Sequence, residues 1–210
     1  MEMKARSERT RVRRLPKRGA YDDATIAAIL DAGLVCHVGF VDKATPLVIP
    51  MLYWRDGDRI YLHGSRDSRI LRVLCEAEAC VTVTHLDGIV LARSAFHHSA
   101  NYRSVTILGR PQPLAGAAEK TRALRAFLDR LAPDRWPALR PVTPKELDLT
   151  NVAVMSLNEA AAKIRTGGPI DDPEDLTWPC WAGVVPVRLV AGEPIAEANV
   201  SGDAPQLLLR

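Results

Sequence analysis

The stretch Ser94–Pro111, SAFHHSANYRSVTILGRP, joins a polar, histidine-rich run to a segment with strand character. Val105 and Ile107 alternate with polar or outward positions, which predicts an extended segment with one side on a core, and Gly109 ends it. The polar block ahead of it offers an arginine, two hydroxyl types, an amide and two imidazoles. A core strand does not need that inventory, whereas a bound polar ligand does. Polar runs ahead of strands are also commonly solvated loops, so the residues alone leave both interpretations open.

The composition is that of an ordinary globular protein, with 47% hydrophobic and 25% charged residues in a chain of 210. Eight of the 28 Lys and Arg residues lie in the first 18 positions, against two of the 25 Asp and Glu residues. The basicity therefore belongs to an N-terminal arm, and the remainder of the chain is slightly acidic. Such an arm can bind nucleic acid or an anionic surface, but it can equally be a solvated tail or a segment that wraps a partner subunit.

The arm has no apolar segment typical of a secretory signal, and no apolar run approaches the roughly 18 residues that a membrane span needs. The four cysteines, Cys36, Cys75, Cys80 and Cys180, form no CxxC pair, which argues against a zinc ribbon or a thioredoxin motif. We therefore expect reduced, mostly buried thiols in a cytoplasmic protein without membrane contact.

Periodicity predicts an antiparallel β-barrel with peripheral helices. Helices are expected over 22–32, 68–77 and 116–131, and strands over 34–41, 46–54, 59–63, 79–86, 89–95, 105–108, 147–157 and 181–190. Arg55-Asp56-Gly57-Asp58 is typical of a hairpin turn, and Asp87-Gly88 is interpreted as a second one. Leu86 falls on the opposite parity to Val81 and Val83, which indicates either a strand buried on both faces or a local bulge.

The segment His63–Arg69, HGSRDSR, is a second place where chemistry concentrates. Gly64 permits close backbone approach, Ser65 and Ser68 offer hydroxyls, and a helix N-terminus with nearby arginines can bind an anion. Alternatively, a serine or aspartate merely caps the helix and the arginines are solvated. The glycine spacing and lysine of a P-loop are absent.

Other polar residues give weaker signals. His97 and His98 are adjacent, so on a strand they point to opposite sides and cannot share one metal ion. The acidic run of Asp171, Asp172, Glu174 and Asp175 can bind a divalent cation or a partner's basic arm, although such a run is more commonly a solvated loop. No GxSxG or Cys–His motif supports a hydrolase, and no helix-turn-helix or RNA-recognition signature supports a nucleic-acid regulator.

Several of these segments together resemble a known family. FHHSANYRSVTILGRP, YLHGSRDSRI and a K-x-R run followed by acidic residues and W-x-G are similar to the FMN-binding split-barrel proteins of the pyridoxamine-phosphate-oxidase superfamily. More narrowly, they resemble its nitroimidazole-resistance branch. The resemblance runs from about Arg11 to about Pro194. It implies an antiparallel split β-barrel over residues 19–198, between the basic arm at 1–18 and a tail at 199–210.

The resemblance also implies a set of cofactor-binding positions. The phosphate is expected at Ser65, Ser68 and Arg69, and the flavin ring beside His63, Gly64, Tyr102, Arg103 and Ser104, with Pro50 and Met51 also at the cofactor. Lys163, Arg165 and Trp181 are expected to form the far wall. His63 is the one candidate for a catalytic role. Many oxidases of the superfamily carry glutamine at the Ser104 position, so this departure argues against pyridoxamine phosphate as the substrate.

These implications favour an FMN-dependent oxidoreductase that moves hydride or electrons between a reduced nicotinamide and a small acceptor. The protein would be a homodimer with the cofactor at the interface. One alternative is a non-catalytic sensor or carrier that binds flavin, deazaflavin or haem, with His63, His97 and His98 as the haem ligands to test. The less favoured alternative is a nucleic-acid regulator that uses the basic arm.

Overall fold

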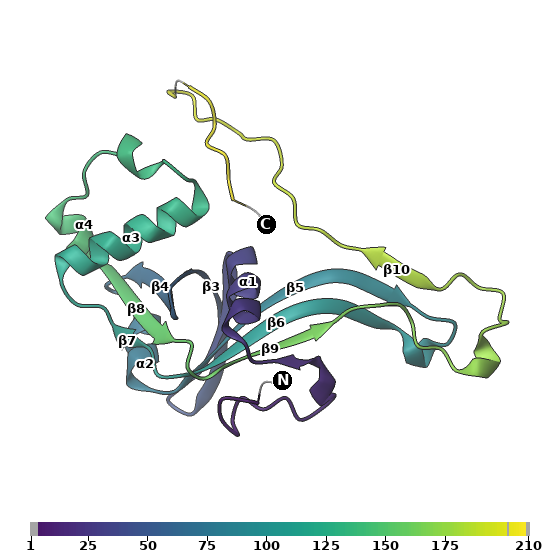
Figure 1. Ribbon diagram of the computed structural model, residues 1–210. Helices are drawn as coiled ribbons and strands as arrows, with labels where there is room; N and C mark the ends of the chain where they lie inside the picture. The colour runs from purple at the N-terminus through teal and green to yellow at the C-terminus, as the bar shows by residue number, and fades with distance from the viewer. Residues whose placement is uncertain (1–3, 201, 209–210) are drawn as a thin grey trace.

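The structure is a computed structural model that describes residues 4–200 and 202–208. Ten described strands form one open, antiparallel sheet in the order β1-β9-β6-β5-β2-β3-β4-β8-β7, with β10 added along β5 (Figure 1). The strands are β1 (Gly19–Ala20), β2 (Val35–Asp42), β3 (Thr45–Asp56), β4 (Arg59–Ser65), β5 (Ala79–Leu91), β6 (Ser99–Gly109), β7 (Gln112–Pro113), β8 (Thr150–Ser156), β9 (Ala160–Arg165) and β10 (Gly183–Pro186). The predicted class, a mainly antiparallel β fold of the split-barrel type with peripheral helices, is confirmed.

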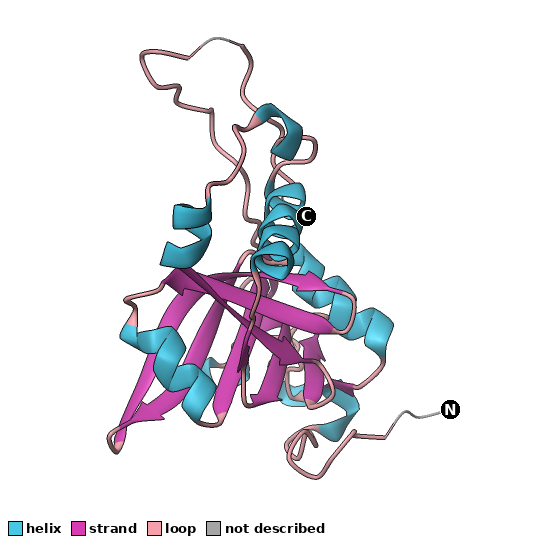
Figure 2. Cartoon of the chain, turned by 90° about the vertical axis from the view of Figure 1, so that its left-hand side faces the viewer, coloured by secondary structure: helices cyan, strands magenta, loops and turns pink. Residues whose placement is uncertain are grey.

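The helices lie outside the sheet (Figures 1 and 2). They are α1 (Asp23–Ala32), α2 (Arg69–Glu76), α3 (Ala117–Leu131) and α4 (Pro144–Leu149), with short 3₁₀ segments at Pro16–Arg18, Ala95–His97, Trp136–Ala138 and Pro173–Asp175. Helix α1 begins where predicted because the Asp22 carboxylate accepts a hydrogen bond from the Thr25 backbone N–H at 2.8 Å. No described helix is long and apolar enough to cross a membrane.

Side-chain alternation divides the apolar residues between two clusters. The larger cluster fills the inside of the curved sheet beneath α1 and α2, and includes Ile60 and Leu62 of β4. The smaller cluster lies on the opposite face of β3, β4 and β8, where Trp54 and Val152 pack beneath α3. Because successive side chains of a strand point to opposite faces, Tyr61 and His63 belong to the α3 side.

The predicted turn at Asp87-Gly88 is wrong. β5 continues from Ala79 to Leu91, with a shift in pairing register to β6 between Leu86 and Gly88. The alternative interpretation, a bulge, is therefore the correct one. Gly88 is needed for close approach rather than for a turn, because a Cβ atom there would lie 2.9 Å from Val184 Cγ1 of β10.

Three further segments differ from prediction. α4 occupies the first residues of the expected strand at 147–157, because Thr143 and Glu146 form a capping box around a helix that starts at Pro144. β9 was not predicted as a strand. The closing strand shortens to Gly183–Pro186, and the chain then leaves the sheet as an extended segment before its end returns to α3, where the Leu208 N–H donates to Leu131 O at 3.1 Å (Figure 1).

The described part of the basic arm is not a solvated tail. Arg6 Nη1 donates to Leu157 O at 2.7 Å, Ser7 Oγ donates to Glu159 at 2.6 Å, and the Val12 N–H donates to Tyr21 Oη at 2.9 Å. Thr10 is buried. The arm therefore packs against its own chain, next to β1 and β9.

Candidate cofactor sites

His63 stands in an apolar cavity on the α3 side of the sheet. Its ring centroid lies 5.8 Å from that of Trp54 and 4.9 Å from that of Phe127. The cavity has a volume of about 430 Å³, within the roughly 300–1,000 Å³ range of ligand pockets. Its lining is His63, Leu124, Phe127, Leu128, Trp136, Leu139, Arg140, Val142 and Glu146. One imidazole thus faces a space whose other walls are mostly hydrocarbon.

The imidazole is held neutral and without a partner. His63 Nδ1 is buried and makes no hydrogen bond with any described residue, and the same holds for the neighbouring Trp54 Nε1. Burial lowers the pKa of His63 below its ordinary value of 6.5. Because an unsatisfied buried polar group costs about 1–3 kcal/mol, native proteins keep few of them without a use. Neutral imidazole with a free nitrogen is the form that binds metal ions.

The rim of this cavity carries one cation, which is paired to a carboxylate. Arg140 donates two hydrogen bonds to Glu146, Nη1 at 3.0 Å and Nη2 at 2.5 Å. This pairing, with the hydrogen bonds that Thr143 donates, lowers the pKa of Glu146 to about 2. Glu146 therefore stays ionised and holds Arg140 at the cavity mouth.

The segment between β4 and α2 contains the expected hydroxyls, but its charges are already paired. Ser65 Oγ accepts from the Asp67 N–H at 3.3 Å, and Ser68 precedes α2 as the N-cap without a side-chain hydrogen bond. Arg69 pairs with Asp42 at 3.1 Å, and Arg66 pairs with Asp148. Gly64 lies close to α2, since a Cβ atom there would lie 3.1 Å from Leu71 Cδ1 and the leucine side chain would have to shift.

Strands β6 and β9 present the second expected group. Ser104 lies opposite Lys163 in the register and donates a hydrogen bond to Lys163 O at 3.2 Å. Tyr102 and Ser104 share one face of β6, so Arg103 points to the other face. There Arg103 forms a bidentate pair with Asp87, with Nη2–Oδ1 at 2.8 Å and Nε–Oδ2 at 3.0 Å. This pairing raises the pKa of Arg103 and neutralises its charge locally.

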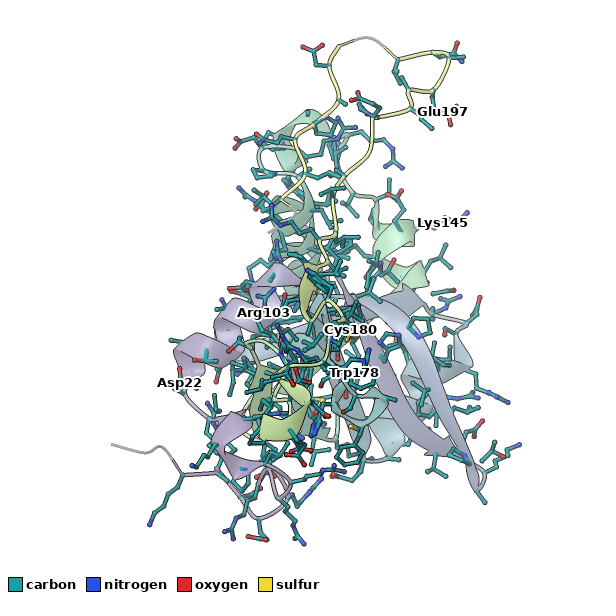
Figure 3. All side chains as sticks on the ribbon, turned by 90° about the vertical axis from the view of Figure 1, so that its right-hand side faces the viewer. Asp22, Arg103, Lys145, Trp178, Cys180 and Glu197 are labelled. Carbon is teal, nitrogen blue, oxygen red and sulfur yellow. The ribbon has the colours of Figure 1, made fainter. Side chains whose placement is uncertain are left out.

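The remaining expected residues differ in exposure. Arg165 is buried, where it donates to the Asn101 side chain and, from Nη2, to Gly168 O at 3.3 Å, so it supports the turn after β9. Trp181 is exposed, on the loop that joins β9 to β10 and also carries Trp178 and Cys180 (Figure 3). On β3, Pro50 is exposed and Met51 packs against the core.

The two weaker histidines make local contacts. His97 Nε2 lies 3.2 Å from Asp172, and His98 Nδ1 lies 2.9 Å from Ser94 O. No group of three or more His, Cys, Asp or Glu side chains suited to a metal ion occurs within residues 4–200 and 202–208.

The expected residues thus fall into two groups within one chain. β4 carries His63 and Ser65, and β6 carries Tyr102 and Ser104, with β3, β2 and β5 between them. At about 4.8 Å per strand, these groups are about 19 Å apart along the sheet. Sequence reasoning missed Trp54, Phe127 and Arg140 around His63, because α3 was interpreted as packing alone. The aromatic residue on the inner stripe of that helix was the available signal.

Comparison with known proteins shows that this chain has the split-barrel fold of flavin-binding proteins. The sequence profile described as pyridoxamine 5'-phosphate oxidase matches residues 22–164. The flavocytochrome Anf3 from Azotobacter vinelandii is 44% identical, with a TM-score of 0.92 over 97% of this chain and 95% of that chain. The FAD and heme binding protein from Mycobacterium smegmatis is 35% identical, with a TM-score of 0.83 over 88% of this chain and 91% of that one.

The chain therefore belongs to the pyridoxamine 5'-phosphate oxidase family, as the sequence resemblance implied. A structure described as a 5-nitroimidazole antibiotic resistance protein from Bacteroides thetaiotaomicron shares the fold, with 20% identity and a TM-score of 0.59 over 70% of this chain and 86% of that chain. No curated protein matched the sequence.

Proposed function

We propose that the protein is a redox protein that binds a flavin and a haem at separate places on the sheet. The single observation that carries this proposal is His63, a neutral imidazole whose Nδ1 is buried and unpartnered beside an apolar cavity of about 430 Å³. Two similar structures, described as a flavocytochrome and as an FAD and heme binding protein, support the pairing of the two cofactors.

The residues around His63 fit a haem. A ring nitrogen of His63 would ligate the iron, while Phe127, Leu124 and Leu128 would enclose the apolar macrocycle. Arg140 at the rim would face a carboxylate of the group. When bound, the haem supplies one-electron chemistry. The chain's own part is to hold the imidazole neutral, to exclude water from the cavity and to keep a cation at its mouth.

The flavin is assigned to the outer face of β2, β3, β5 and β6, which carries Pro50, Tyr102 and Ser104 at its two ends. The β2–β3 part of this face is apolar and open, with Val48 69% and Val41 54% exposed. A second copy of the chain would cover it, and the flavin ring would lie between the copies. The proposed homodimer would use this face, and the partner's Trp181, which lies on an exposed loop, would complete the site.

The finer parts of the proposal concern electron flow. A reduced nicotinamide would supply hydride to the flavin, and the electrons would pass singly to the haem or to a small acceptor. A carrier or sensor without turnover is the second candidate, favoured because Arg103 points away from the outer face and pairs with Asp87, so it supplies no charge there to stabilise a reduced flavin. Turnover with reduced nicotinamides separates the two. The cytoplasmic location stays a prediction.

The decisive experiment is the visible spectrum of the purified protein and of its His63→Ala variant. The wild type is expected to show a Soret band and an oxidised-flavin band, and the variant to keep only the flavin band. Absence of a Soret band after haem reconstitution of the wild type would contradict the haem assignment. Absence of flavin after reconstitution with FMN and FAD would contradict the flavin assignment.

A further inference from the structure

The basic arm forms a groove on the sheet whose arginines none of the assignments above uses. A cavity of about 270 Å³ lies between residues 9–14 of the arm and the outer face of β6 and β9. The arm contributes Arg9, Arg11, Arg13 and Arg14, and the sheet contributes Ser104, Thr106 and Lys163. Cations thus stand on both walls, with hydroxyl groups on the floor.

The arm is fixed in place by contacts that do not use Arg11, Arg13 or Arg14. Ser7 Oγ donates to Glu159 at 2.6 Å, and the Val12 N–H donates to Tyr21 Oη at 2.9 Å. Thr10 is 6% exposed and its hydroxyl donates to Ser7 O at 3.1 Å. The guanidinium groups are therefore presented by an ordered backbone, and a ligand does not have to order the arm when it binds.

The groove keeps a surplus of positive charge after internal pairing. Arg9 pairs with Glu78 at 2.6 Å, and Glu8 is shared by Arg13 at 3.1 Å and Arg11 at 3.6 Å. Arg14 and Lys163 form no ion pair with any described residue. The β4–α2 segment differs, because both of its arginines, Arg66 and Arg69, face carboxylates. Of these two segments, the arm groove therefore keeps the more unpaired positive charge.

The groove shares its face with the open apolar strands. Register partners run straight across the sheet from Thr106 to Thr82, from Thr82 to His37 and from His37 to Pro50. Three strand steps of about 4.8 Å place Pro50 about 14 Å from Thr106 on one surface. A ligand with a flat ring at β3 and phosphate groups in the groove would lie along this row.

We infer that the arm groove binds the diphosphate of a dinucleotide, with Arg14 and Lys163 as its principal cations. A diphosphate matches the two unpaired cations better than a single phosphate does, because it presents oxygens to Arg14 on the arm and to Lys163 on the sheet at the same time. Two dinucleotides share this chemistry: a flavin adenine dinucleotide and a reduced nicotinamide dinucleotide. The inference rests on the proposed flavin function only if the ligand is the flavin adenine dinucleotide.

The test measures binding by the apoprotein of riboflavin, FMN, FAD and NADH, followed by flavin and nicotinamide fluorescence. Arg14→Gln and Lys163→Gln are compared with Arg122→Gln, which removes an exposed arginine from α3, the helix that packs over β3 and β4 rather than over β6 and β9. Thermal unfolding of each variant checks that the fold is retained.

If FAD is the ligand, each groove variant is expected to weaken FAD binding about tenfold, as the loss of one charge-assisted hydrogen bond predicts. Riboflavin binding and the control variant should not change, and the preference for FAD over FMN should fall. If the nicotinamide dinucleotide is the ligand, the same loss appears for NADH while FAD binding is unchanged.

Two results would overturn the inference. In the first, flavins and NADH bind but neither groove variant changes any affinity, which leaves the proposed flavin function intact. In the second, the variants lose only salt-dependent retention on DNA, which makes the groove a nucleic-acid contact. If no flavin binds the wild type, the proposed flavin function is contradicted instead. The NADH measurement then still shows whether the groove binds a diphosphate.

Discussion

The cavity around His63 and the groove beneath the arm are built on opposite physical principles. The cavity is apolar and holds one uncharged imidazole whose Nδ1 has been removed from water. The groove is polar and keeps Arg14 and Lys163 unneutralised at the surface among the described residues. The cavity suits an apolar ligand with a metal ion that the imidazole nitrogen can coordinate, and the groove suits a ligand with anionic oxygens. One sheet thus offers two cavities of opposite chemical character.

The comparison also separates functional from structural arginines. Arg103 and Arg165 occupy positions that the family resemblance assigns to the cofactor, yet the first is bound to Asp87 and the second to Asn101 and the turn after β9. Counting arginines in the sequence therefore overestimates the positive charge near the flavin. Only the arginines and lysines that form no ion pair within the chain keep their full positive charge for a ligand.

The largest expected effect is on the cavity. His63→Gly should abolish haem retention, a loss greater than the roughly 10–100-fold that substitutions in the outer shell of a metal site cause. Added imidazole should restore a Soret band, because the glycine leaves room for it beside Phe127. Flavin binding should not change. A Soret band of undiminished intensity in the variant without imidazole would assign the ligand to another residue.

The next effect tests whether Arg165 is structural. Asn101→Leu removes the side-chain acceptor of a buried guanidinium, and a hydrogen bond to a charged group contributes about 1.5–3 kcal/mol. Urea unfolding of the apoprotein should show a loss of this size. FAD and FMN affinities should stay within experimental error of the wild type. A selective loss of flavin affinity with unchanged stability would return Arg165 to the cofactor site.

The local part of this fold could be predicted from sequence, because its causes are local. Gly57 adopts a positive φ of 59° at the predicted hairpin, and Asp22 caps α1 at the predicted start of that helix. The Thr143–Glu146 capping box was equally visible, but the apolar residues after it were interpreted as a strand. Gly88 was misread because the reason for a glycine there is β10, nearly 100 positions later in the chain.

The candidate sites depended on contacts that sequence cannot supply. The cavity takes His63 from β4, Phe127 from α3 and Arg140 from a connecting loop, which come together only because α3 covers β3 and β4. The ion pair of Arg69 with Asp42 joins α2 to the end of β2. The family resemblance predicted which segments matter, whereas the partners of each charge required the structure.

A smaller effect is expected at the cavity mouth. Glu146→Gln removes the negative charge that holds Arg140, so Arg140 becomes available to a haem carboxylate and haem binding should tighten severalfold. The control is Glu119→Gln, which removes a similar carboxylate that pairs with Arg122 on α3. Haem titration of both variants measures the difference. Weaker binding in Glu146→Gln than in the control would show that the Arg140–Glu146 pair shapes the site rather than competes for it.

The smallest effect is a pH dependence of the apoprotein that belongs to the cavity alone. Burial lowers the pKa of His63 in the folded state below the 6.5 of the unfolded chain. Between these two pKa values the unfolded state binds more protons than the folded state. The contribution of a neutral, buried His63 to the free energy of unfolding is therefore fully present above pH 6.5 and is lost as the pH falls towards the folded pKa. For this one group, the free energy of unfolding cannot change by more than about 1.4 kcal/mol per pH unit, and the partial exposure of His63 reduces that change. His63→Leu should remove this component, seen as a smaller fall in the urea midpoint between pH 7.5 and 5.5, while Arg14→Gln in the groove should leave it unchanged. An equal fall in wild type and His63→Leu would mean that the imidazole is not desolvated, and would remove the contrast between the two sites.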